Sequence, residues 1–266
     1  MSGADWLLIG SDPRVALAAE LLKKEGGTVV VHAADKWDSK TGELVQNCRP
    51  HRLVLPMRPL AGVPGPDVFK SVGEVFAGLL DDDWETTLDR AEKRPHRYLT
   101  EERFVWENAG LTAEGFLASW YAAGRGTMRG REFWIAGYGR VGKTLARLLR
   151  PAGATVTVMA RSPASLAEAV QEGFGFCPLP QTGAAVRPPV LVNTIPSRWL
   201  DPEGQVKPEL ILDLASLPGC LAPGCRHEYY ELLPALPGKW FPHDAARLLA
   251  EALCRIDGER KGRNDA

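Results

Sequence analysis

The sequence has no long apolar run and no excess of charge of either sign. None of its hydrophobic stretches reaches the roughly 20 residues that a transmembrane helix needs. The chain carries 32 Lys and Arg against 33 Asp and Glu, a formal net charge of −1. Such a balance provides no basic surface for nucleic acid or for an anionic membrane. We therefore expect a chain that binds neither nucleic acid nor a membrane.

Disulfide, secretion and metal signals are also missing. The five cysteines are an odd number spread from Cys48 to Cys254, which is not a disulfide framework in a chain of 266 residues. The start MSGADWLLIGSDPR lacks the basic and apolar regions of a signal peptide. We expect a cytoplasmic protein. The spacing of Cys220, Cys225 and His227 fits no zinc signature, so no metal centre is predicted.

Short apolar runs alternate with amphipathic segments, a pattern typical of α/β proteins. In the first part of the chain, strands are predicted at 6–10, 28–32 and 52–56, with a helix at 13–25 between the first two. The turn after the first strand, IGSDPR, lacks the repeated glycines of a pyrophosphate site. This part is predicted to be a Rossmann-like domain that holds substrate and no dinucleotide.

The second part repeats the pattern more clearly. A short strand near 103–106 and a helix from Thr112 precede it, and Pro242 begins a last helix followed by a polar tail. Its strands are predicted at 132–136, 155–159, 190–193, 210–213 and 231–234, and its helices at 140–150 and 163–172. The expected domains are 1–111, a linker helix 112–126, a cofactor domain 127–241, and 242–266 as a helix returning to the first domain plus the tail. The fold class is α/β, with two Rossmann-like doubly wound domains and a cleft between them.

The stretch IAGYGRVGKT (135–144) fits two phosphate-binding patterns at once. One is the dinucleotide pattern G-x-G-x-x-G, and the other is the P-loop pattern G-x-x-x-x-G-K-[ST], for which 210–213 could serve as the Walker B strand. The chain closes a β-α-β unit of about thirty residues around the loop, as a dinucleotide site expects. We therefore interpret the stretch as a dinucleotide loop.

The strand after this loop ends in Arg161-Ser162, where a Rossmann domain contacts the adenine ribose. An acidic residue there would bind a 2′-hydroxyl, whereas Arg with Ser suits a 2′-phosphate, and Arg140 could add a second cation. NADP is the predicted cofactor. The loops after the later strands should also approach it. The predicted cofactor-binding residues are Gly137, Tyr138, Gly139, Arg140, Val141, Gly142, Arg161, Ser162, Thr194, Ile195, Pro196 and Ser216.

Six segments resemble, in order and spacing, the A-subunit family of dipicolinate synthase, over most of residues 110–256. They are LTAEG (111–115), GYGRVGKTLAR (137–147), GATVTVMARS (153–162), VNTIPS (192–197), LILDLASLPG (210–219) and LLPALPGKWFP (232–242). The resemblance implies NADP-dependent oxidation of a dihydrodipicolinate-type ring to pyridine-2,6-dicarboxylate during sporulation. It also implies a partner, which would be a flavoprotein-like B subunit. A homo-oligomer is left open.

A small dicarboxylate substrate needs cations, hydroxyls or helix N-termini around it. The predicted substrate-binding residues are Ser11, Asp12, Arg14, Asn108 and Thr112. Arg58 is a further cation after the third strand. Glu114 and His243 are the predicted catalytic residues, His243 because its pKa range suits proton transfer.

Each of these residues has a structural alternative. Asp12 can simply cap its helix, and Glu114 can be a first-turn acid favoured by the helix dipole. Two other functions also stay open: another two-domain NAD(P) dehydrogenase of a small carboxylate, and a non-catalytic NADP-binding regulatory subunit. The second is suggested by Leu111, Trp240 and His243, which depart from the family pattern.

Overall fold

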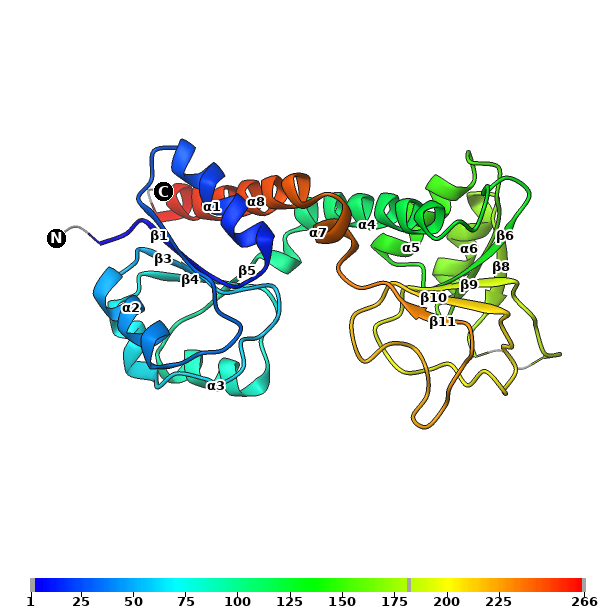
Figure 1. Ribbon diagram of the computed structural model, residues 1–266, viewed down its shortest axis with the longest axis horizontal. Coiled ribbons are helices and arrows are strands. Elements are labelled where there is room, and N and C mark those ends of the chain that lie inside the picture. The colour runs from blue at the N-terminus through cyan, green and yellow to red at the C-terminus, as the bar shows by residue number, and fades with distance from the viewer. Residues whose placement is uncertain (1–2, 181–182, 265–266) are drawn as a thin grey trace. The chain divides into compact units, whose positions relative to one another are not determined.

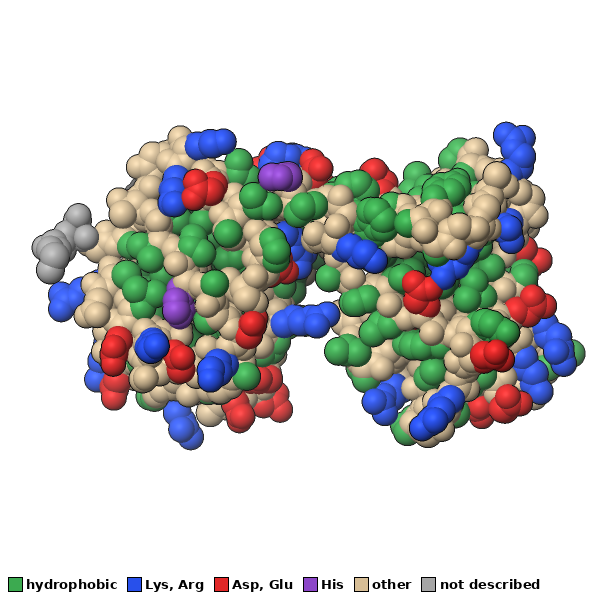
Figure 2. All heavy atoms as spheres, in the orientation of Figure 1, with side chains coloured by type: hydrophobic (Ala, Val, Ile, Leu, Met, Phe, Trp, Pro, Cys, Tyr) green, Lys and Arg blue, Asp and Glu red, His purple; other side chains and the backbone are tan. Residues whose placement is uncertain are grey.

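The structure is a computed structural model that describes residues 3–180 and 183–264, except for the side chains of 260–264. The chain divides into two compact units (Figure 1). Unit 1 consists of Met1–Asn108 with Phe241–Ala266, and unit 2 of Ala109–Trp240. Each unit is built around one parallel sheet. On the face drawn in Figure 2, basic and acidic side chains are interspersed over each unit, in keeping with the small net charge.

Unit 1 contains a five-stranded sheet in the order β2-β1-β3-β4-β5, with all neighbours parallel. The strand order changes direction between β1 and β3, so the ends of these two strands form the switch point of this sheet. In Figure 1, α1 and α8 lie on one side of the sheet and α2 and α3 on the other. The elements are β1 (Trp6–Ile9), α1 (Pro13–Lys24), β2 (Val29–His32), α2 (Ser39–Cys48), β3 (Arg52–Val54), η1 (Pro66–Ser71), β4 (Glu74–Ala77), α3 (Asp82–Arg90), β5 (His96–Arg97), η2 (Tyr98–Thr100) and α8 (Pro242–Asn264).

Helix α8 is part of unit 1 because its apolar face packs on α1 and because Asp257 and Arg255 pair with residues of unit 1. Asp257 accepts a hydrogen bond from Arg52 Nε at 2.6 Å, and both side chains are largely buried. The Arg52 guanidinium also lies 4.9 Å from the centre of the Trp6 ring. Arg255 donates to Glu101 at 2.8 Å. These pairs hold the helix on unit 1, and it continues through Asn264, where the sequence had predicted a polar tail from residue 257.

Unit 2 contains a six-stranded parallel sheet in the order β8-β7-β6-β9-β10-β11. This is the Rossmann order, with its switch point between β6 and β9. Its elements are β6 (Glu132–Ala136), α5 (Arg140–Leu149), β7 (Thr155–Ala160), α6 (Pro163–Gln171), β8 (Gly175–Pro178), β9 (Val190–Asn193), β10 (Leu210–Asp213), β11 (Tyr230–Leu232) and α7 (Leu236–Trp240). The predicted α/β class with two doubly wound domains is confirmed.

Helix α4 (Glu102–Ala122) passes from unit 1 into unit 2. The predicted strand near 103–106 is wrong, and the predicted linker helix, 112–126, has different bounds. The helix begins early because a Glu101 carboxylate oxygen accepts the Phe104 N–H at 2.7 Å, so Glu101 caps the helix, whose start was predicted at Thr112. Thr112 therefore lies buried inside the helix. None of the described helices is long and apolar enough to cross a bilayer.

Candidate functional site

The glycine loop of unit 2 follows β6 at the switch point of the sheet. Gly137 has φ +95°, and a Cβ there would lie 2.5 Å from Thr194 Oγ1. A Cβ on Gly142 would lie 2.1 Å from the Gly137 carbonyl oxygen. Thr194 Oγ1 in turn donates to the Ala136 carbonyl at 2.9 Å, which ties the loop after β9 to the loop after β6. The turn is therefore shaped by the close approach of the Gly142 and Gly137 backbones and by the Thr194 hydroxyl, and these leave no room for a side chain at Gly137 or Gly142.

Gly139 is the N-cap of α5 and has no capping side chain. Among the described residues, no heavy atom beyond the chain neighbours of Gly139 lies within 4 Å of the position that a Cβ there would take. The first N–H groups of α5 are thus not covered by a cap, and the helix dipole favours an anion in front of them. A cavity of about 580 Å³ opens at this point. The arrangement suits a phosphate group of a nucleotide.

The residues around this cavity match part of the sequence prediction. Gly137, Tyr138, Gly139, Arg161, Ser162 and Ile195 line it, and all six were predicted. Ala160 and Ser165 also line it and were not predicted. Ser165 lies in the first turn of α6 and donates its N–H to Ser162 Oγ at 3.4 Å. The other predicted residues, Arg140, Val141, Gly142, Thr194, Pro196 and Ser216, lie outside the lining of the cavity.

The side chain of Tyr138 anchors the glycine loop to the core of unit 2. Its ring is 6% exposed and packs edge-to-face on Phe174, with the ring centres 6.4 Å apart. Burial, with a further contribution from Glu172, raises the pKa of Tyr138 to about 12. The residue therefore contributes its backbone and an anchored ring to the cavity wall, and its hydroxyl stays protonated at neutral pH.

The P-loop interpretation does not fit this geometry. Helix α5 already begins at Arg140, so Lys143 lies within the helix and pairs with Glu168 of α6 at 2.7 Å. Thr144 Oγ1 donates to the Arg140 carbonyl at 2.8 Å, an internal helix contact. A P-loop needs both side chains turned toward phosphates and a metal ion. Here they serve helix packing.

Asp213, the acid of the Walker B alternative, is fully buried and acts as a structural hub. Asn193 Nδ2 donates to its carboxylate at 2.7 Å, and the Tyr230 hydroxyl does so at 3.0 Å. The N–H groups of Ala215 and Cys220 add bonds of 3.0 and 2.6 Å. Asn193 and Asp213 are cross-strand partners at the ends of β9 and β10. They fix the two loops that follow these strands, and sequence reasoning missed this role.

The predicted substrate turn of unit 1 holds its own ion pair. Arg14 is buried, and its Nε and Nη2 contact the Asp12 carboxylate at 2.9 and 2.5 Å. Burial raises the pKa of Asp12, but the hydrogen bonds and charge of Arg14 outweigh it and hold that pKa below its ordinary value. Ser11 is exposed and hydrogen-bonds Asp35. Arg58 is exposed, and its charge also lowers the pKa of Asp12. It is therefore an accessible cation near this turn.

The remaining predicted residues lie on α4 and α8. Asn108 and Thr112 are on α4, half-buried and buried, and Glu114 is exposed on the same helix. His243 is exposed in the first turn of α8. Asn108 and His243 belong to unit 1, whereas Thr112 and Glu114 belong to unit 2.

Two further motif residues have clear packing roles. A Cβ on Gly115 would lie 2.9 Å from Leu236 Cβ, so α4 and α7 pack closely there. Trp240 Nε1 donates to Ser119 Oγ at 2.8 Å and its ring packs on the core of unit 2. Trp240 is thus an anchor of the fold.

The Cys220, Cys225 and His227 side chains have separate environments. Cys220 is buried beside Asp213, and burial raises its thiol pKa. Cys225 contacts Asp201 at 3.8 Å, and His227 Nε2 contacts the Pro208 carbonyl at 2.9 Å. Among the described residues, no group of three or more His, Cys, Asp or Glu side chains is arranged to hold a metal ion.

Comparison with known proteins finds similarity to the dipicolinate synthases, although no protein-family profile matches the chain. The A subunit of dipicolinate synthase from Bacillus subtilis (strain 168) is 30% identical over 196 residues, which are 70% of this chain and 65% of that protein. The chain thus spans just under two thirds of the length of this curated relative. The resemblance inferred from the motifs is confirmed.

Solved structures share the fold over nearly the whole chain. The crystal structure of the dipicolinate synthase A chain from Bacillus subtilis has a TM-score of 0.80 at 23% identity, and the match covers 99% of this chain and 98% of that chain. D-lactate dehydrogenase from Escherichia coli has a TM-score of 0.61 at 13% identity, with 97% of both chains covered. The fold is that of the two-domain dehydrogenases.

Proposed function

We propose that this chain, a relative of the dipicolinate synthase A subunit, is an NADP-dependent dehydrogenase. In this proposal it oxidises a dihydrodipicolinate-type ring to pyridine-2,6-dicarboxylate, in the cytoplasm of a sporulating cell. The observation that carries the proposal is the α5 N-terminus, which has no capping side chain and faces a cavity that Arg161 also lines. Such an N-terminus at a Rossmann switch point fits the pyrophosphate of a dinucleotide.

The preference for NADP rests on the end of β7. Arg161 and Ser162 are both exposed there and line the cavity, and Ser165 stands one turn further along α6. A guanidinium can bind a phosphate with two parallel hydrogen bonds, and the hydroxyls supply further donors. No acidic residue lines this cavity to bind a ribose 2′-hydroxyl among the residues that the structure describes. These groups together favour a 2′-phosphate.

For the proposed oxidation, the protein has to position the substrate against the cofactor and to remove one proton from the substrate ring. A bound nicotinamide ring would supply the hydride acceptor. In the proposal, Ser11, Asn108, Thr112 and the Asp12–Arg14 turn hold the substrate, with Arg58 as the accessible cation for one carboxylate. His243 is exposed and its imidazole accepts the ring proton, with Glu114 as the alternative acceptor. A flavoprotein-like B subunit is the proposed partner.

Cofactor binding is the first test. NADPH fluorescence should report binding to the purified chain, with NADH binding more weakly. Arg161→Ala should weaken NADPH binding roughly tenfold, the loss of a charge-assisted contact, and leave NADH binding nearly unchanged. Equal loss for both cofactors, or tighter binding of NADH to the unmodified chain, would contradict the NADP assignment.

Catalysis needs a separate test. The chain co-expressed with a B subunit should form pyridine-2,6-dicarboxylate from the dihydro substrate, followed by ultraviolet absorbance. The Arg161→Ala variant serves as the matched control and should form product only at higher NADP concentration. Cofactor binding without product in the presence of B would overturn the dehydrogenase proposal in favour of a non-catalytic NADP-binding protein.

A further inference from the structure

A second cavity lies in unit 1, among α1, α8 and the first turns of α4. Its volume is about 560 Å³, enough for a small organic molecule, and it shares no residue with the glycine-loop cavity. All its lining residues come from these three helices, apart from Glu25 at the end of α1. No strand end contributes to it, so it is separate from the switch point of this sheet.

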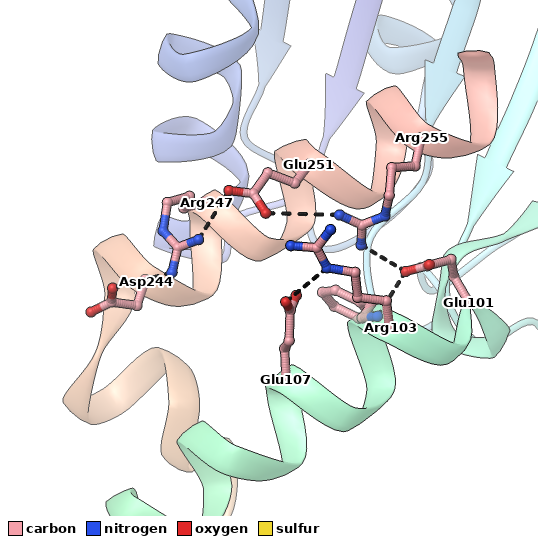
Figure 3. Close-up of polar contacts among 8 residues, drawn as sticks. Glu101, Arg103, Glu107, Asp244, Arg247, Glu251 and Arg255 are labelled. Carbon is pink, nitrogen blue, oxygen red and sulfur yellow. Dashed lines mark hydrogen bonds and ion pairs between the residues drawn. The ribbon is translucent and has the colours of Figure 1, made fainter. Parts of the chain in front are cut away.

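Three arginines converge on this cavity from α4 and α8, as Figure 3 shows. Each arginine is oriented by a carboxylate that accepts a hydrogen bond from one of its guanidinium nitrogens. The bonds are Arg103 Nε to Glu107 Oε1 at 2.9 Å, Arg247 Nη1 to Glu251 Oε1 at 2.9 Å, and Arg255 Nη2 to Glu101 Oε2 at 2.8 Å.

Several terminal guanidinium nitrogens are left over by these bonds. Among the described residues, neither Nη atom of Arg103 has a hydrogen-bond partner. Arg247 Nη2 lies 3.7 Å from Asp244, and Arg255 Nη1 lies 3.7 Å from Glu251, both beyond hydrogen-bond distance. The acids thus fix the direction of the guanidinium groups without using all of their donors.

The rest of the lining combines charge with apolar surface. Lys24 adds a fourth cation, whereas Glu25 and Glu251 are the only acids among the described residues of the lining. Leu21, Leu22 and Ala250 supply apolar contact area. The cavity therefore offers cations from three helices around a partly apolar wall.

We propose that this cavity binds a small organic anion that carries two carboxylates on an apolar body. Arginine forks match carboxylates with two parallel hydrogen bonds, and arginines on two helices can each take one end of such a molecule. The apolar residues contact the body between the carboxylates. The ligand acts as an effector and not as the reacting molecule, because no residue of either switch-point loop is among the described residues that line the cavity.

The test uses the full-length chain and two variants. Benzene-1,3-dicarboxylate and pyridine-2,6-dicarboxylate are titrated by calorimetry, with benzoate and inorganic phosphate as probes that lack the second carboxylate or the apolar body. The test variant is R103Q/R247Q, in which the replaced side chains are 62% and 53% exposed, so folding is retained. The control is K23Q, which removes a positive charge from α1 next to the cavity residues Leu22 and Lys24, although Lys23 itself does not line the cavity.

We expect both dicarboxylates to bind more tightly than benzoate or phosphate. R103Q/R247Q should raise their Kd roughly a hundredfold, about tenfold for each arginine, whereas K23Q should leave the Kd unchanged. A titration in which R103Q/R247Q weakens no binding event would overturn the proposal, because all binding would then take place elsewhere on the chain, including the proposed substrate site. Equal binding of benzoate or of phosphate would do the same.

Cys254 gives an independent readout, because it is exposed and lines the cavity. Dicarboxylate should slow alkylation of Cys254, measured by mass spectrometry, while Cys225 in unit 2 reacts at its usual rate. No heat of binding and no protection of Cys254 at millimolar dicarboxylate would refute the site.

Discussion

Each of the two sheets places a loop and a helix N-terminus at its switch point, but the two helix N-termini are capped differently. In unit 1, the Asp12 carboxylate accepts the Arg14 N–H at 2.9 Å and caps α1 from within the chain. In unit 2, Gly139 caps α5 with no side chain, and a cavity opens in front of it. Both helices have the same dipole. The difference teaches that the cap residue decides whether a helix N-terminus binds the chain itself or a ligand.

The strongest test of this comparison replaces two glycines of the unit 2 loop in turn. Gly142→Ala puts a methyl group 2.1 Å from a backbone oxygen, so we expect a loss of about 3 kcal/mol of unfolding free energy and no NADPH binding. In Gly139→Ala the new methyl group meets no atom of the described residues within 4 Å beyond its chain neighbours, and the backbone conformation is an allowed one, so stability should be retained. Its methyl group should still weaken NADPH binding. Urea denaturation and fluorescence titration measure the two effects, and unimpaired binding by Gly139→Ala would contradict the assigned phosphate position.

The matching change in unit 1 is Asp12→Ala. It removes a helix cap and leaves the buried Arg14 without its partner, so we expect a loss of about 2 to 3 kcal/mol of unfolding free energy. This loss of unfolding free energy is smaller than for a fully buried ion pair, because the Asp12 side chain is 35% exposed. NADPH binding by unit 2 should persist. A variant as stable as the unmodified chain would show that the pair contributes no net stability.

The same pair predicts a pH dependence. Arg14 holds the pKa of folded Asp12 below its unfolded value of about 4, so the stabilisation is complete above that pH. It is lost as the pH falls through the lower pKa of the folded state. The stability difference between the unmodified chain and Asp12→Ala should therefore shrink on acidification below pH of about 4, measured by urea denaturation. A difference that is constant with pH would rule out this linkage.

In unit 2 a carboxylate also holds loops together, but this carboxylate is the buried Asp213 at the end of β10, which does not line the cavity. Asp213→Asn places an amide among donors from Asn193, Cys220 and Tyr230, and should cost about 2 kcal/mol of unfolding free energy. Tyr230→Phe removes one bond only and should cost about 1 kcal/mol. NADPH binding should weaken more in Asp213→Asn than in Tyr230→Phe, because both neighbouring loops shift. Equal effects of the two changes would argue against Asp213 as the hub.

The smallest effect is expected for Lys143→Ala. Lys143 pairs with Glu168 on the surface between α5 and α6, so its loss should cost less than about 1 kcal/mol. NADPH affinity should be unchanged, because the ammonium group points at α6 and not into the loop. A large loss of nucleotide binding would revive the P-loop interpretation.

The sequence predicted what depends on local pattern. Glycine spacing and the Arg161-Ser162 pair located most of the cavity lining, because strand, loop and helix follow one another along the chain. The Asn193–Asp213–Tyr230 network was not foreseen, since its bonds join residues 17 and 20 positions apart. A polar residue at the end of each of the apolar strands VLVN and LILD was the available signal.

Two of the elements that the sequence did not predict correctly, β8 and α4, have unusual ends. Strand β8 begins with Gly175 and ends with Pro178, two residues that discourage a strand assignment. Helix α4 begins after Glu101, which is not among the preferred caps, and its first turns carry Phe104, Val105 and Trp106. The charged helix α3 and strand β4 lie between residues 57 and 102, a stretch in which no helix or strand bounds were predicted. In β8 and at the start of α4, tertiary packing overrides the local preference.

The discontinuous makeup of unit 1 has a consequence for synthesis of the chain. Helix α8 buries Leu248, Leu249 and Leu253 in unit 1, yet it follows all of unit 2 in the sequence. A ribosome therefore completes residues 109–240 before it supplies the last helix of the unit that it began first. Unit 2 has its whole sequence available earlier, and unit 1 must keep the α1 surface uncovered until α8 emerges. Unit 1, whose synthesis begins first, is therefore the last of the two units to complete its fold.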